Sequence, residues 1–399
     1  MSVDPGAQEI VIWGRLDSQI RSGALRKYLQ DESLGEGTIT LIIRDPNITI
    51  IGDMNLDWYD KEEEAPLYGC KSLLRVDLKG CTKLTQLGYC VFQGCSSLTS
   101  VALPDGLTQL CNRVFYECSS LTSVALPDGL TQLGDGVLSE CSSLTSVTLP
   151  DGLTQLGHDV FMDCSSLTTV ALPDGLTQMG NRVFGGCSSL TNVSLPDGVT
   201  QLGNFVFACC SSLTSVSLPD GVTQLRNSVF YKCSSLTSVA LPDRLTQLGD
   251  YVFKECSSLK SVALPDGVTQ LGDNVFRECS SLKSVALPDG LTQLGHNVFD
   301  GCSSLTSLAN SAGFDTVELY LRDRYKCVIL RKLFLRLFGK YNRAVNEANG
   351  TEAEKNATAL AYFPADNSST LDVGLFLQTM NASGGDGVIG LVGHILKFV

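Results

Sequence analysis

Residues 95–117 read C-S-S-L-T-S-V-A-L-P-D-G-L-T-Q-L-C-N-R-V-F-Y-E, and this 23-residue unit decides the fold. Its first cysteine recurs at a constant spacing to give nine complete units and the start of a tenth, at Cys95, Cys118, Cys141, Cys164, Cys187, Cys210, Cys233, Cys256, Cys279 and Cys302. A unit of this size cannot bury its apolar face alone, so it must stack on its neighbours. The period therefore predicts one solenoid rather than the two or three compact domains that 399 residues would otherwise suggest.

Each unit contains one short predicted strand, in the pattern L-x-x-V-x-L. Alternation along a strand sends Val101 and Leu103 to the core. The residues between them, Ser100 and Ala102, face outward. Pro104 ends the strand because it has no N–H to donate to the neighbouring strand of the sheet. A one-turn helical or 3₁₀ segment starting at Val114 and Phe115 is expected to close the coil.

Two glycine positions in the unit predict turns with positive φ, one in Pro-Asp-Gly and one after Leu. Arg244 replaces the first glycine, and Cys111 and Arg226 replace the second. If these positions require positive φ, the three residues carry local strain of about 1 kcal/mol or more. Arg244→Gly is then expected to stabilise the protein.

Two apolar columns are expected inside the stack. Because equivalent cysteines would lie one above another with parallel side chains, which suits a disulfide poorly, they are predicted to be reduced core residues. The remaining cysteines show no C-x-x-C spacing, so the sequence does not predict a zinc site. The second column is formed by phenylalanines, with Leu138 as its single exception: Phe115, Phe161, Phe184, Phe207, Phe230, Phe253, Phe276 and Phe299.

The chain outside the regular units predicts degenerate repeats and two caps. Residues 1–38 are predicted to form an N-terminal cap with an amphipathic helix at 15–32. The solenoid covers residues 39–308, with degenerate repeats over 39–94 and regular ones over 95–308. Residues 309–399 are predicted to form a helical C-terminal cap or domain, whose first helical region, 315–347, has a basic face at 322–343.

The unit L-x-x-V-x-L-P-D-G-L-T-Q-L-G-x-x-V-F-x-x-C resembles the BspA-like class of leucine-rich repeats over about residues 39–308. The resemblance implies an α/β leucine-rich-repeat solenoid that is right-handed and has a parallel β-sheet along one face. Members of this class generally serve as binding modules. They occur in bacterial and protist surface proteins and in many intracellular eukaryotic proteins.

Several classes of function are disfavoured by composition and motifs. The net charge of −13 argues against a general nucleic-acid binder. The three histidines, His158, His296 and His394, fit no nucleophile or metal motif, so the sequence predicts no enzyme, no metal and no cofactor. Residues 385–390 match G-x-G-x-x-G, but no βαβ unit surrounds them.

The location is predicted to be intracellular and cytoplasmic. The first six residues have neither the basic nor the apolar region of a signal peptide. The apolar stretch at 388–399 is too short to span a bilayer and is interrupted by His394 and Lys397, so no membrane span is predicted.

Comparison of the units with one another indicates where a partner would bind. The outward sheet positions hold small residues, mostly Ser, Thr and Ala, whereas the pairs before Val-Phe and before Cys vary. Tyrosine and arginine anchors dominate protein interfaces. The candidate partner-binding residues are Arg113, Tyr116, Phe205, Tyr231, Tyr251 and Arg277. The basic face at 322–343 is a second candidate contact, alternatively a solvated capping helix.

The sequence thus favours a non-enzymatic scaffold that binds an unidentified protein. A surface or secreted adhesin and a structural subunit of a larger assembly are the alternatives. Ordering of water or ice on the Ser/Thr/Ala face is a further alternative.

Overall fold

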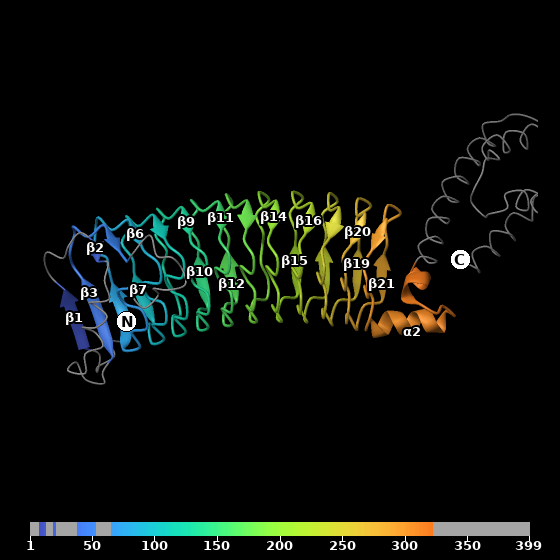
Figure 1. Cartoon of the computed structure of the whole chain (residues 1–399), viewed down its shortest axis with the longest axis horizontal. Coiled ribbons are helices and arrows are strands. Elements are labelled where there is room, and N and C mark those ends of the chain that lie inside the picture. The colour runs from blue at the N-terminus through green and yellow to red at the C-terminus, as the bar shows by residue number, and fades with distance from the viewer. Residues whose placement is uncertain (1–7, 13–18, 21–37, 53–64, 322–399) are drawn as a thin grey trace, which may run out of the picture. The chain divides into compact units, whose positions relative to one another are not determined.

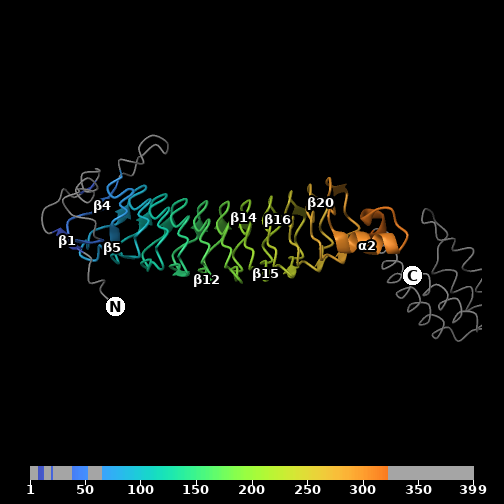
Figure 2. The same cartoon turned by 90° about the horizontal axis from the view of Figure 1, so that it is seen from below.

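The structure is a computed structural model and describes residues 8–12, 19–20, 38–52 and 65–321. The chain divides into two compact units, Met1–Val317 and Glu318–Val399. The first unit is a stack of β-coils, seen from two directions in Figures 1 and 2. The solenoid predicted from the period, with the parallel β-sheet that the resemblance implies, is therefore confirmed. The basic face at 322–343 and most of the predicted C-terminal helices lie outside the described residues.

The first strands of the units pair in parallel on one side of the stack, in four short sheets here together called the first ladder (Figure 1). The units that start at Cys118 and Cys187 contribute only single bridges, at Ala125 and Ser194. Equivalent residues pair, as in Val147 with Val170. The valine and leucine of each strand point inward, while Ser100 and its equivalents are exposed, as predicted. The strands of this ladder are β1 (Gln8–Ile12), β3 (Ile39–Ile43), β5 (Leu73–Asp77), β7 (Ser100–Ala102), β10 (Ser146–Thr148), β12 (Thr169–Ala171), β15 (Ser215–Ser217), β17 (Ser238–Ala240), β19 (Ser261–Ala263) and β21 (Ser284–Ala286).

A second parallel ladder, which the sequence did not predict, runs through the Gln-Leu pairs (Figure 1). Its strands are only two residues long, and the leucine of each points into the core. They are β2 (Gln19–Ile20), β4 (Ile50–Ile51), β6 (Gln86–Leu87), β8 (Gln109–Leu110), β9 (Gln132–Leu133), β11 (Gln155–Leu156), β13 (Gln178–Met179), β14 (Gln201–Leu202), β16 (Gln224–Leu225), β18 (Gln247–Leu248), β20 (Gln270–Leu271) and β22 (Gln293–Leu294).

The third side of each coil, here called the turn side, closes without a helix. Tyr116 N donates to Arg113 O at 3.2 Å, and Cys118 N donates to Phe115 O at 3.1 Å. Two overlapping turns therefore replace the predicted helical or 3₁₀ segment. Arg113 and Glu117 have φ of 57° and 58°, which a right-handed helical turn does not allow.

Columns of cysteine and phenylalanine form the core. From Cys118 to Cys302, each repeat thiol donates to the main-chain carbonyl 26 residues earlier, at 3.0–3.1 Å. None of the fifteen described cysteines forms a disulfide and all but Cys209 are buried, in agreement with the predicted core role. Burial raises the pKa of these thiols, that of Cys164 to about 12.

The phenylalanine rings stack face to face along the core. From Phe161 to Phe299 their centroids are 5.4–5.7 Å apart and their planes differ by 4–7°. Phe92 and Phe115 stack in the same way, with centroids 5.4 Å apart. Leu138 separates these two groups of rings, as the sequence predicts.

The prediction of backbone strain at the two glycine positions is wrong. Neither the Pro-Asp-Gly nor the Leu-Gly glycines have positive φ, and Arg244, Cys111 and Arg226 do not either. The Leu-Gly glycines are instead confined by the preceding coil: a Cβ on Gly180 would lie 2.5 Å from Gly157 O. The structure offers no single contact that explains why Cys111 and Arg226 fit at this position.

The two ends of the described stack differ from expectation. Gln19–Ile20 form β2, which pairs with β4, so the helix predicted at 15–32 is wrong at these residues; the rest of it lies outside the described residues. At the other end, the tenth unit turns into α2 (Ser303–Ser311), which buries Leu305 and Ala309. The predicted boundary after Leu308 falls inside this helix. Residues 317–321 are helical as well.

Candidate functional site

Variation between coils is concentrated on the turn side, in two columns of residues with left-handed backbone. The first turn column precedes Val-Phe and consists of Cys90, Arg113, Gly136, Asp159, Arg182, Phe205, Ser228, Tyr251, Asn274 and Asn297. The second turn column precedes the cysteine and consists of Gly94, Glu117, Glu140, Asp163, Gly186, Cys209, Lys232, Glu255, Glu278 and Gly301. Neither column holds a β-branched residue, for which positive φ is most unfavourable. Only the backbone conformation is fixed here, so the side chains can differ.

Main-chain hydrogen bonds between coils hold both columns in place. Arg113 N donates to Asp135 O at 2.9 Å, and Glu117 N donates to Ser139 O at 3.0 Å. The same bonds recur along the stack. Each turn therefore presents its variable side chains from a backbone that is fixed to the next coil.

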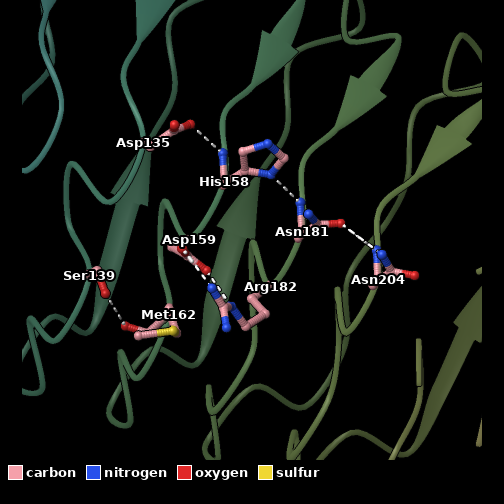
Figure 3. A network of polar contacts seen from close by, with 8 residues as sticks. All are labelled: Asp135, Ser139, His158, Asp159, Met162, Asn181, Arg182 and Asn204. Atoms are coloured by element: carbon pink, nitrogen blue, oxygen red, sulfur yellow. Dashed lines mark hydrogen bonds and ion pairs between the residues drawn. The ribbon is translucent and has the colours of Figure 1, made fainter. Parts of the chain in front are cut away.

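A polar ladder runs beside the first turn column, through the residue that follows Leu-Gly (Figure 3). Each side chain but that of the last member, His296, accepts a hydrogen bond from the main-chain N–H of its equivalent in the next coil, at 2.7–3.1 Å. The ladder consists of Asn112, Asp135, His158, Asn181, Asn204, Asn227, Asp250, Asp273 and His296. His158 accepts through Nδ1, which requires the tautomer with its proton on Nε2.

Sequence reasoning missed this ladder because it treated the position as simply variable. The signal was present, since all nine residues are Asn, Asp or His. These three side chains place an acceptor at the same short distance from the backbone. The ladder is structural, and it aligns the turns that carry the variable residues.

Two of the six candidate residues form a cluster in the N-terminal coils. The Arg113 guanidinium lies over the Tyr116 ring, 5.3 Å from its centroid. The Tyr116 hydroxyl donates to Glu140 Oε1 at 2.6 Å. Burial, and then the Glu140 carboxylate, raise the pKa of Tyr116 well above its usual value.

A hollow of about 390 Å³ follows this cluster, because Gly136 and Ser139 leave the next coil without large side chains. Figure 3 shows its far wall, where Arg182 donates to Asp159 at 2.7 and 3.2 Å. The hollow therefore lies between the cluster of Arg113 and Tyr116 and the ion pair of Arg182 with Asp159.

Tyr231 and Tyr251 belong to a second cluster, here called the aromatic–lysine cluster, together with Lys232, Lys254 and Glu255. The Lys254 ammonium lies 5.6 and 5.7 Å from the two ring centroids, and Lys232 lies 5.2 Å from that of Tyr231. The Tyr231 hydroxyl donates to Glu255 at 3.3 Å, and both lysines lie 3.6 Å from the same carboxylate. Cation–π contacts and ion pairs thus order this surface.

The remaining candidates lie on either side of this cluster. Phe205 stands in the first turn column with 40% of its surface exposed. Arg277 lies 3.2 Å from Asp300 and 3.5 Å from Glu278, so its guanidinium is engaged within the fold. The six candidates share the turn side but do not form one patch, and their role in binding stays a prediction.

The sheet faces carry few large or charged side chains compared with the turn side. Outward residues of the first ladder are mainly Ser, Thr and Ala. Threonine hydroxyls that flank both ladders donate to main-chain carbonyls of the preceding coil, as Thr168 does to Thr145 O at 3.2 Å and Thr177 to Thr154 O at 3.1 Å. These hydroxyl protons are used inside the fold rather than offered to a partner.

The described part of the chain contains no group of three or more His, Cys, Asp or Glu side chains placed to hold a metal ion. His158 and His296 are separated by several coils and belong to the polar ladder. Within the same residues, no helix has the length and hydrophobicity needed to cross a lipid bilayer.

Comparison with solved structures finds leucine-rich-repeat proteins. A protein from Bacteroides ovatus is 23% identical, with 65% of this chain and 86% of that chain covered and a TM-score of 0.39. A protein from T. pallidum is 31% identical over 45% of this chain and 79% of that one, with a TM-score of 0.37. A leucine rich cell surface protein from Faecalibacterium prausnitzii is 24% identical over 74% and 86%, with a TM-score of 0.46.

Comparison with curated proteins gives no match. The family described as "BspA type Leucine rich repeat region (6 copies)" matches residues 64–191 and 177–306, more than half of the sequence. These residues include all the regular coils with their cysteine and phenylalanine columns. The chain belongs to the BspA-type leucine-rich-repeat family.

Proposed function

We propose that the chain is a non-enzymatic scaffold that binds a protein partner through the turn side of its solenoid. One observation carries this proposal: large aromatic and charged side chains differ from coil to coil in the two turn columns, on a backbone that hardly differs. Interfaces draw most of their energy from a few such anchors, held in place before binding.

The contrast with the sheet faces supports the choice of side. Those faces repeat small residues, and the threonines that flank them donate their hydroxyl protons within the fold. A partner there would meet nearly the same surface on every coil. The turn side presents a different combination of groups on each coil, so it can specify one binding register.

Four lysines allow a direct test by crosslinking. Lys232 and Lys254 lie on the turn side, whereas Lys260 and Lys283 are exposed next to the first ladder. The full chain is crosslinked to the proteins that co-purify with it, and the linked peptides are identified by mass spectrometry. Links from Lys232 and Lys254 are expected. Links mainly from Lys260 and Lys283 would place the partner on the sheet and refute the proposal.

We further propose a reducing, intracellular location. None of the fifteen described cysteines forms a disulfide, and Cys209 is exposed. Oxidising compartments favour disulfides, and exposed free thiols suit reducing ones. Labelling of intact cells with a membrane-impermeant biotin reagent is expected to leave the protein unlabelled, and labelling would instead support a surface protein. The contact predicted through residues 322–343 stays a prediction.

A further inference from the structure

A groove of about 340 Å³ follows the outer face of the second ladder, over the three-stranded sheet of β11, β13 and β14. One wall is formed by three exposed glutamines, Gln155, Gln178 and Gln201. The other wall is formed by members of the polar ladder, which Figure 3 shows. Glycines between the two walls leave the floor without side chains. This groove, here called the glutamine groove, therefore runs from coil to coil along the stack.

The repetition of glutamine in this column is not explained by hydrogen bonds within the fold. In the part of the chain that the structure describes, the side-chain amides of Gln155, Gln178 and Gln201 bond to no other residue. Only Gln86 and Gln109 of the column bond to each other, at 3.2 Å. The repeated threonines, by contrast, donate to the preceding coil. Yet glutamine occupies this outward position in every strand of the second ladder from β6 to β22, in the same units whose turn positions differ.

The chemistry of the two walls favours a neutral ligand that is rich in hydroxyl groups. An amide side chain offers two donor hydrogens and an acceptor oxygen, and a hydroxyl likewise donates and accepts. The wall opposite the glutamines continues this neutral surface with His158, Asn181 and Asn204. Among the described residues that line the groove, the charged ones are Asp135 and Arg226, one at each end. A charged ligand would therefore find no net opposite charge along the groove.

A peptide strand would find few groups to pair with in this groove. Gly180 N donates to Leu156 O at 2.9 Å. Gly203 N donates to Met179 O at the same distance, so the main chain of the floor is already bonded between coils. Strand addition needs unpaired main-chain groups, and it gains specificity from pockets for alternate side chains. The groove instead repeats glutamine and glycine at each coil, which suits a polymer whose own units are identical.

We propose that the glutamine groove binds an unbranched neutral polysaccharide, which lies along the stack with its hydroxyls bonded to Gln155, Gln178 and Gln201. Coils about 4.8 Å apart present one amide to each successive sugar ring, because the two repeats are similar in length. The lining residues include no Phe, Tyr or Trp, so binding depends on hydrogen bonds, each of which gains little in exchange with water. This site is separate from the turn side and goes beyond the proposed function.

A glycan array that carries neutral and charged chains of graded length is the probe, with the full chain applied to it. Neutral unbranched chains should bind, and binding should persist in about 0.5 M salt because the groove carries no net charge. Isothermal titration calorimetry then measures affinity against chain length. Affinity should rise until the polysaccharide spans the distance from Asp135 to Arg226, about 19 Å, and level off beyond it.

The triple variant Gln155→Ala, Gln178→Ala, Gln201→Ala tests the wall directly. Its affinity for the tightest-binding chain should fall by about tenfold or more, since three hydrogen-bonding side chains are lost. Its melting temperature should stay that of the parent, because the three side chains are exposed and bond to nothing in the described fold. The variant therefore separates loss of binding from loss of folding.

The matched control makes the same three changes on the next sheet, of β16, β18, β20 and β22. There the polar ladder holds Asp250 and Asp273, so the wall opposite the glutamines is anionic rather than neutral. The control variant is Gln247→Ala, Gln270→Ala, Gln293→Ala. It should bind the polysaccharide with an affinity within about twofold of the parent.

Loss of affinity confined to the first triple variant, at an unchanged melting temperature, supports the proposal. Absence of binding to every neutral chain, binding to charged chains that salt abolishes, or an equal loss in both triple variants would overturn it. Peptides from a displayed random library that bind the parent and are lost in the first variant would also overturn it, since they would place a peptide in the groove. The crosslinking experiment on the turn side is decided separately from all of these outcomes.

Discussion

Phe205 and Phe207 belong to the same coil, two residues apart, and show how its core column differs from its turn columns. Phe207 is fully buried and stacks on Phe184 and Phe230, with ring centroids 5.6 Å away on each side. Phe205 exposes 40% of its surface, and the ten residues of its column belong to eight amino-acid types. In the core column the neighbours fix the side chain, whereas in the turn column they fix only the backbone. Repetition therefore indicates packing, and variation indicates surface that is free to differ.

The largest effect expected from the core columns is alkaline unfolding. Burial raises the pKa of nine repeat thiols, so the unfolded chain releases these protons at lower pH than the folded chain. The stability they contribute is complete below their unfolded pKa of about 9 and is lost as pH rises above it. Above that pH each thiol lowers the free energy of unfolding by about 1.4 kcal/mol per pH unit, so all nine together lower it by on the order of 10 kcal/mol per unit.

Circular dichroism between pH 7 and 11 checks this expectation. A flat stability below about pH 8.5 should give way to steep unfolding above about pH 9. Cys209→Ser removes a single, exposed thiol whose pKa is also raised by partial burial, so it should change the steepness of the transition by no more than about one part in ten. A chain that stays folded at pH 11 would show that the thiols are not buried as described.

Substitution of the two phenylalanines tests the comparison most directly. Phe207→Ala removes a ring with no exposed surface and should lower the free energy of unfolding by about 3–5 kcal/mol. Phe205→Ala should change it by less than about 1 kcal/mol, since its ring is partly in solvent. Chemical denaturation of both variants measures the difference. Equal losses would mean that the exposed ring also supports the fold.

Two glycines of one coil test how closely neighbouring coils approach each other, with a smaller expected effect on stability. A Cβ on Gly180 would meet the main chain of Gly157 and His158 at 2.5–2.8 Å, whereas on Gly175 its nearest neighbour is 3.7 Å away. Gly180→Ala should therefore cost about 1–3 kcal/mol through overpacking. Gly175→Ala should stay within about 0.5 kcal/mol of the parent. Similar melting temperatures for the two variants would contradict the close approach of the coils.

The smallest expected effect reverses the expectation drawn from sequence. Because Arg244 does not have positive φ, Arg244→Gly relieves no strain. It should instead destabilise by about 0.5–1 kcal/mol, since glycine makes the unfolded chain more flexible. Thermal melting decides the sign, and a stabilised variant would restore the original expectation.

Much of the solenoid could be predicted because its constraints repeat. The period, the inward Val and Leu of the first ladder and the phenylalanine column with its exception at Leu138 all follow from spacing and alternation. The second ladder could not be predicted in this way. Its strands are two residues long, too short for alternation to appear, and they depend on neighbours 23 residues away.

The positions with positive φ were predicted wrongly for a related reason. Positive φ was expected at glycines, yet most residues of both turn columns are not glycine. Hydrogen bonds from each turn to the next coil hold Arg113, Phe205 and similar residues in a conformation that local preference disfavours. The six candidate residues lie on the turn side, and their role in binding stays a prediction. The grouping of Tyr231 and Tyr251 around Lys254 depends on contacts between coils that no single unit reveals.

The exception at Leu138 has a mechanical consequence. Between the coil of residues 118–140 and the next one, both ladders are interrupted: the first keeps only the bridge of Ala125 to Thr148, and β9 does not pair with β11. The ring stack is broken at the same place. The junction between the coils of residues 187–209 and 210–232 is interrupted in the same way, with only the bridge of Ser194 to Ser217 and no pairing of β14 with β16. There, however, Phe207 and Phe230 stay stacked. If the described array is pulled along its axis, the junction after the coil of Leu138 therefore lacks both continuous ladders and stacked rings. The solenoid should behave as two stiff segments joined at a fracture plane, and the first rupture in a single-molecule pulling experiment should divide it there.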